Sequence, residues 1–180
     1  MNVRESIEKD AECGVSELFA KFGGKLYNTA FLMCCNAADA EDLTMRTFEN
    51  AVRRIAQYDP SKPVFPWLCG ILTNCYRMDL RGKGRNCLDF MEEPPDLADE
   101  RPDPTEVLAR EADAKTVRDA VAALPDGYRA LVVLRYYDDL TVPQIAAHML
   151  LTEGTVKRRL HEARALMRGE IMRTNRGETA

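Results

Sequence analysis

The chain has 180 residues, of which 46% are hydrophobic and 30% charged, a composition that excludes a disordered chain. This length accommodates two domains of about 70 residues each. The formal net charge is −4, which taken alone argues against a nucleic-acid partner.

The charge is unevenly distributed along the chain. Residues 77–85 contain four basic residues and one acidic residue, and residues 153–176 contain seven basic and three acidic. Between them, residues 89–113 contain ten acidic and two basic residues. The negative total therefore hides two basic patches that are suited to nucleic acid.

The sequence predicts a cytoplasmic protein without a membrane span. The N-terminal residues lack the apolar core of a secretion signal, and no run approaches the roughly 18 apolar residues of a membrane span. The six cysteines have no CxxC or Cys/His spacing suited to zinc, so we interpret them as reduced thiols. We expect neither a metal nor a cofactor.

Apolar residues at helical spacing predict three helices in the first half of the chain. The first spans about residues 15–35, with Phe19 and Phe31 in its apolar stripe. The second is expected to begin at Asp39 as its N-cap. The third has an inner face that runs from Trp67 to Met78.

Prolines mark two irregular segments. Residues 57–64 contain two prolines, which block a helix there and predict a loop. Residues 86–104 lose helical periodicity, and their prolines stand among acidic residues, which predicts an extended linker.

Two further helices are predicted after the linker. Asp103 and Glu106 form a capping pair for a helix that ends near Leu124. Asp126 is expected to cap the next helix, in which Tyr136 faces inwards. No strand pattern is present, and the predicted fold class is all-α.

The last segment has the pattern of a helix-turn-helix. Thr141 and Gln144 make a capping box for a short helix, and Thr152 caps a longer one after the turn at Leu150 and Leu151. In this motif the second helix enters the DNA major groove. Lys and Arg side chains there neutralise phosphates or read guanine edges, and backbone N–H groups at the helix start lie near phosphates. The candidate contacts to duplex DNA are Thr155, Lys157, Arg158, His161, Glu162 and Arg164.

Two stretches together resemble the extracytoplasmic-function sigma factors. Residues 40–48 (AEDLTMRTF) and 65–74 (FPWLCGILTN), with the basic tail that follows, look like sigma region two. Residues 123–125 (ALP), 145–146 (IA) and 153–164 (EGTVKRRLHEAR) look like sigma region four.

The resemblance implies two small helical domains in a protein that is not an enzyme. Residues 1–86 would form region two, which binds core RNA polymerase and recognises and melts the minus-ten element. Residues 87–104 would form the acidic linker, and residues 105–175 region four, which reads the minus-thirty-five element as duplex. The implied partners are core RNA polymerase, promoter DNA and an anti-sigma factor.

The resemblance also assigns residues in region two. The expected polymerase contacts, which share one face of the second helix, are Asp42, Met45, Arg46 and Glu49. The expected minus-ten contacts, in the loop and along the third helix, are Asp59, Ser61, Lys62, Asn74, Arg77, Arg81, Lys83 and Arg85.

Some positions depart from the family pattern. Met45 and Arg46 stand where the family usually has Gln and Glu, which implies altered polymerase docking. Glu162 stands where a basic residue is common, and Leu150 replaces the usual turn glycine. A leucine with positive φ at that turn would be strained.

Three other functions are weighed against this interpretation. A sigma-like decoy would bind an anti-sigma factor without engaging DNA, but such a mimic would lose the basic patches. If the protein were a helix-turn-helix repressor, the motifs in residues 40–85 would have no explanation. An enzyme has no support, because the sequence has no phosphate-binding glycine loop and no evident catalytic residues.

Overall fold

The structure is a computed structural model that describes residues 11–83 and 114–176, with side chains from Ser16 onward. The N-terminal half (residues 11–83) contains α2 (Ala11–Cys34), α3 (Ala37–Arg53), the 3-10 helix η1 (Ile55–Gln57) and α4 (Val64–Gly82). The C-terminal half (residues 114–176) contains α6 (Ala114–Ala122), α7 (Asp126–Val132), the π-helical turn η2 (Val133–Tyr137), α8 (Val142–Met149) and α9 (Glu153–Asn175). Every regular element in these ranges is a helix, which confirms the all-α prediction.

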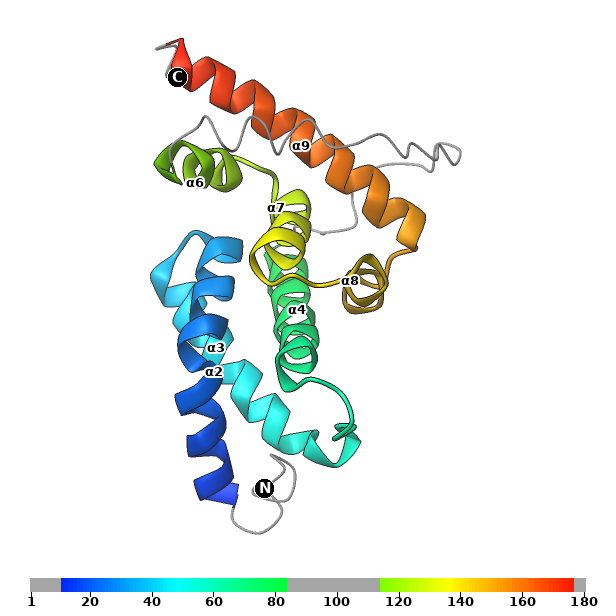
Figure 1. The fold of residues 1–180 in the computed structure, drawn as a ribbon. Helices are drawn as coiled ribbons and strands as arrows, with labels where there is room; N and C mark the ends of the chain where they lie inside the picture. The colour runs from blue at the N-terminus through cyan, green and yellow to red at the C-terminus, as the bar shows by residue number, and fades with distance from the viewer. Residues whose placement is uncertain (1–10, 84–113, 177–180) are drawn as a thin grey trace.

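The two halves lie against each other. In the N-terminal half α2 packs along α3, and α3 packs on α4. In the C-terminal half α9 crosses α6, α7 and α8 (Figure 1). The halves meet where α4 touches α8 and where α2 touches α7 and η2. The predicted linker and the predicted Asp103 cap lie outside the described residues.

Two predicted helix caps are wrong. The N-cap of α3 is Asn36, whose side chain accepts a hydrogen bond of 3.0 Å from the backbone N–H of Asp39. The chain reverses just before it, where Cys35 has a φ of 53°, and this places Asn36 in the extended conformation that an N-cap needs. Similarly, Pro125 precedes α7, and Asp126 is the first helical residue.

The predicted caps of the last two helices are confirmed. Thr141 and Gln144 form a reciprocal capping box at the start of α8, and Thr152 accepts a hydrogen bond from the backbone N–H of Thr155 at the start of α9. Between them, Leu150 adopts the left-handed conformation, with φ 54° and ψ 49°. The turn therefore has the geometry for which a glycine is usual, although a leucine occupies it.

Leu150→Gly is expected to stabilise the protein by about 1 kcal/mol, because the left-handed conformation costs a residue with a Cβ atom about that much. The leucine side chain is 69% exposed, so little buried apolar area is lost with it. Urea unfolding followed by circular dichroism would measure the change. The control is Leu151→Gly, which removes a partly buried side chain without relieving a positive φ and should destabilise. Equal destabilisation by both substitutions would contradict the strain at Leu150.

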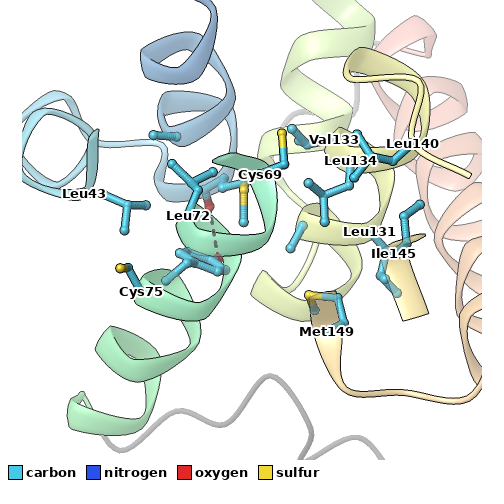
Figure 2. Packing of buried hydrophobic residues seen from close by; sticks show 14 of the residues in the cluster. Leu43, Cys69, Leu72, Cys75, Leu131, Val133, Leu134, Leu140, Ile145 and Met149 are labelled. Atoms are coloured by element: carbon cyan, nitrogen blue, oxygen red, sulfur yellow. Dashed lines mark hydrogen bonds between the residues drawn. The ribbon is translucent and has the colours of Figure 1, made fainter. Parts of the chain in front are cut away.

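The buried apolar side chains form one cluster that extends through both halves. Figure 2 shows Leu43 and Leu72 of the N-terminal half on one side of Cys69, and Leu134 and Ile145 of the C-terminal half on the other. All five of these residues are fully buried, at 0% exposure. The halves therefore share a continuous core in this structure.

Four apolar residues that were expected to face inwards are exposed. On α2 the buried stripe includes Leu18 and Ala30, and each of the phenylalanines Phe19 and Phe31 lies one position later, about 100° around the helix. Two of them make ring contacts, Phe19 with Phe48 and Phe31 with Tyr27. A third, Tyr136, accepts a hydrogen bond from Arg164 at its hydroxyl. The fourth, Met78 on α4, is 61% exposed.

Candidate nucleic-acid interface

The outer face of α9 carries two exposed side chains that match the predicted duplex contacts. Val156 and Leu160 are buried against the core, so Lys157 and His161, each one position later, face solvent. The two side chains lie one helical turn apart, on the same side of the helix. A capped helix that follows a tight turn and presents a cation at its start has the geometry of a recognition helix.

The other predicted contacts on α9 are half-buried and bonded within the protein. Arg158 forms an ion pair of 3.0 Å with Glu162, whose second carboxylate oxygen accepts a 2.7 Å hydrogen bond from the Tyr128 hydroxyl on α7. Glu162 thus holds α9 on α7, and its acceptors are already engaged. Thr155 lies 2.8 Å from the Thr152 hydroxyl. Arg164 donates a 3.3 Å hydrogen bond to the hydroxyl of Tyr136, a neighbour that sequence reasoning had placed in the core.

The loop that precedes α4 is built by short-range hydrogen bonds. Asp59 accepts hydrogen bonds from the backbone N–H and the hydroxyl of Ser61, at 3.0 and 2.8 Å, and these bonds lower the pKa of its carboxyl. Lys62 is exposed, and its carbonyl accepts a hydrogen bond from the buried Tyr58. The ring of Tyr58 packs on Trp67, with centroids 4.9 Å apart, so the tryptophan is a packing residue here.

The predicted minus-ten contacts on α4 and at its end differ in how exposed their side chains are. Arg81 is exposed, and Asn74 is half-buried. Lys83 is exposed but forms a 2.8 Å ion pair with Asp39. Arg77 is only 4% exposed, so its guanidinium is not available to a phosphate in this conformation, contrary to the expected exposure. The last residue of the predicted set, Arg85, lies outside the described residues.

The predicted polymerase-docking face on α3 is exposed except at one residue. Asp42, Met45 and Glu49 are exposed, and Met45 is 54% accessible. Arg46 is half-buried and donates to both carboxylate oxygens of Asp79 on α4, while its Nε lies 2.8 Å from Asp42. The hydrogen bond to Asp79 raises the pKa of Arg46. The Arg46 guanidinium therefore links α3 to α4 within the protein.

Sequence reasoning missed two residues beside this face. Met78 and Asp79 of α4 join Asp39, Arg46 and Lys83 around a shallow hollow between α3 and α4. Asp79 lies 33 residues from Arg46 in the sequence, and nothing in its local pattern marks it as a partner. The hollow beside the predicted docking face is therefore lined by carboxylates and cations together, with the exposed Met78 among its lining residues.

Within residues 11–83 and 114–176, no group of three or more His, Cys, Asp or Glu side chains is placed to hold a metal ion. None of the described helices is long and apolar enough to cross a membrane.

Comparison with known proteins matches both halves. The Sigma-70 region 2 family matches residues 18–86, and the Sigma-70 region 4 family matches residues 114–167. The ECF RNA polymerase sigma factor RpoE of Cereibacter sphaeroides is 30% identical over 84% of this chain and 83% of its own length. The ECF sigma factor SigE of Mycolicibacterium smegmatis is 30% identical over 91% of this chain, which spans only 63% of that relative.

A solved structure supports the fold. The sigma factor RpoE from Bartonella quintana, crystallised with the anti-sigma factor NepR, matches with a TM-score of 0.64 at 20% identity. The match covers 87% of this chain and 96% of that one. Fold, helix-turn-helix and family matches together define a two-part helical transcription factor of the sigma-70 class. Within that class, the chain belongs to the extracytoplasmic-function sigma factor family.

Proposed function

We propose that this protein binds bacterial core RNA polymerase and directs promoter-specific transcription initiation, without itself catalysing a reaction. The observation that carries the proposal is the turn at Leu150, which presents α9 with Lys157 and His161 exposed for the minus-thirty-five duplex. The other half presents the exposed acidic and apolar face of α3 for polymerase. A decoy for an anti-sigma factor would not need the exposed cation on α9.

Each half has a different role in promoter recognition. The N-terminal half, proposed as residues 1–86, docks on polymerase and reads the minus-ten element through the Asp59 loop and Asn74. The C-terminal half, proposed as residues 105–175, reads the minus-thirty-five element. The protein acts in the cytoplasm, where polymerase and promoter DNA are found, and an anti-sigma factor is a further expected partner.

The direct test is run-off transcription with purified core polymerase on a random promoter library. Discrete transcripts that share a sequence motif and depend on the added protein support the proposal. Binding to an anti-sigma factor without any dependent transcript would favour the decoy and overturn the proposal.

Asn74→Ala is expected to reduce open-complex formation while sparing binding to duplex DNA. The amide of Asn74 has both a donor and an acceptor for a base edge, and it matters only once a base has left the stack. Permanganate footprinting of the melted region would measure the loss, and a duplex minus-thirty-five binding assay serves as the control. An equal loss in both assays would contradict the proposed division of work.

A further inference from the structure

The carboxylate of Glu162 joins side chains from two different helices. Its Oε1 accepts a 3.0 Å hydrogen bond from Nη1 of Arg158, which lies one helical turn earlier on α9. Its Oε2 accepts a 2.7 Å hydrogen bond from the hydroxyl of Tyr128 on α7, 34 residues earlier in the sequence. We call this chain of hydrogen bonds, which runs from α7 to the outer face of α9, the Tyr128–Glu162–Arg158 network.

The network lies at the surface but is partly shielded from water. The side chains of Arg158 and Glu162 are 31% and 35% exposed, and Tyr128 is half-buried. Burial, together with the hydrogen bond to Glu162, raises the pKa of Tyr128. The phenol therefore keeps its proton at neutral pH and acts as a donor to the carboxylate.

Arg158 is placed where a recognition helix reads bases. Val156 and Leu160, two positions before and two after it, are buried, so Arg158 lies on the opposite side of α9 from them. It is the sixth residue of α9, within the first two turns, and this part of a recognition helix contacts base edges. The exposed Lys157 and His161 lie on the outer face beside it.

The hydrogen bond to Glu162 leaves one edge of the Arg158 guanidinium available. It uses Nη1, whereas Nε and Nη2 make no hydrogen bond with the residues that the structure describes. A guanine presents two acceptors, O6 and N7, in the major groove, and two neighbouring N–H groups of an arginine match them. A carboxylate that holds Nη1 therefore fixes the direction in which this edge points.

The contact from α7 makes the support stronger than an ion pair alone. A single exposed ion pair between residues four apart on a helix changes an equilibrium by only about a factor of two. Ordering a long side chain at an interface costs a factor of about two to ten in affinity. Tyr128 fixes the carboxylate from a second helix, so most of the ordering of Arg158 is achieved before DNA binds.

The carboxylate also limits what Arg158 can bind without reading a base. An unpaired cation on this face would bind any phosphate, whatever the sequence. Glu162 neutralises Arg158 and repels phosphates, so it lowers affinity for unrelated DNA while it keeps the arginine in place. A glutamate thus has a use at a position where a basic residue would add affinity for every sequence.

We propose that Glu162 and Tyr128 are positioning residues for promoter specificity, which hold the Arg158 guanidinium so that it reads one guanine of the minus-thirty-five element rather than the phosphates. The inference rests on the proposed sigma-factor function. It requires that loss of Glu162 changes two kinds of binding in opposite directions. Preference for the correct base pair should fall, and affinity for unrelated DNA should rise.

The test measures binding of polymerase holoenzyme to a set of duplexes by fluorescence anisotropy. Each duplex carries the minus-thirty-five element selected in the run-off assay with one base pair replaced, and an unrelated duplex gives the sequence-independent affinity. Arg158→Ala identifies the base pair that Arg158 reads, because the wild-type preference is lost at that position alone. That base pair is then the readout for the other variants.

Glu162→Ala should reduce the preference at this base pair by about two- to tenfold. It should also raise affinity for the unrelated duplex, more at low salt than at high salt. The matched control is Glu170→Ala, which removes a carboxylate that is ion-paired with Arg173 on the same helix, about 12 Å further along. An equal loss of preference in the control would assign the effect to net charge and overturn the proposal.

Tyr128→Phe separates positioning from charge, because it removes the hydroxyl and leaves every charge in place. It should weaken the preference at the same base pair without changing affinity for the unrelated duplex. A purely structural role in holding α9 on α7 would instead lower thermal stability and weaken the preference at every base pair that α9 reads. That result would also overturn the proposal.

The double variant Arg158→Ala with Glu162→Ala shows whether Glu162 acts through Arg158. If it does, the double variant has the same preference as Arg158→Ala alone. A further loss would show that Glu162 contacts DNA itself, and an unchanged preference in the single Glu162→Ala variant would show that the network does not position the arginine; either result refutes the inference. If the wild type directs no transcription, the sigma-factor proposal fails and this inference with it, whereas failure of the positioning alone leaves wild-type transcription intact.

Discussion

Reversing the charges of Asp42 and Glu49 together, to lysine, is expected to weaken binding to core RNA polymerase by more than about tenfold. Both carboxylates are exposed on α3, and Met45 lies between them on the same face. A tenfold loss corresponds to about 1.4 kcal/mol, which is modest for two reversed charges at a docking face. Co-purification with core polymerase and a titration by fluorescence anisotropy would measure it.

The control must carry the same change in net charge. Glu17→Lys combined with Asp119→Lys reverses two exposed carboxylates, one on α2 and one on α6, and it breaks the exposed ion pair between Asp119 and Lys115. Asp42→Lys also breaks the exposed ion pair with Arg46, which contributes about 0–1 kcal/mol, so circular dichroism should confirm that the fold survives. Core binding that is unchanged in the double reversal, or equally weakened in the control, would refute the docking face.

The local features of this fold could be predicted from the sequence because they depend on a few adjacent residues. The capping box of Thr141 and Gln144 and the cap at Thr152 each need only four consecutive positions, and both are confirmed. The strained turn at Leu150 follows from its place between these two caps. Asp39 failed as a cap because Asn36, three residues earlier, offers an equivalent side chain. Local chemistry alone does not choose between two such caps.

The features that depend on contacts between distant segments could not be predicted. Arg46 was expected to project from the docking face, yet a carboxylate on another helix, Asp79, holds it. Phe19 and Met78 fit a helical stripe but lie at its edge, where neighbouring helices cover them only in part. The hydrogen bond between Thr29 and Asp138 joins the two halves, and nothing in either local sequence indicates it.

The ion pair within α9 also decides which predicted DNA contact is the better one to test by substitution. Lys157 is exposed, whereas Arg158 is engaged by Glu162. Arg158→Ala would therefore remove the ion pair with Glu162 as well as a positive charge. Lys157→Ala changes only an exposed side chain, so its effect on DNA binding is the easier one to interpret.

Lys157→Ala is expected to weaken binding to minus-thirty-five duplex DNA by about 1–3 kcal/mol if the ammonium group reads a base, and to relax sequence preference at one position. If it contacts a phosphate instead, the loss should be similar for all sequences, and the slope of log affinity against log salt should fall by about one. Binding of polymerase holoenzyme to matched and mutated minus-thirty-five duplexes, measured at several salt concentrations, separates these cases. The control is Arg173→Ala, which removes one positive charge from the same helix about 24 Å further along, together with an ion pair to Glu170. A loss with Arg173→Ala equal to that with Lys157→Ala would show that net charge alone is responsible, and α9 would lose its assignment as the recognition helix.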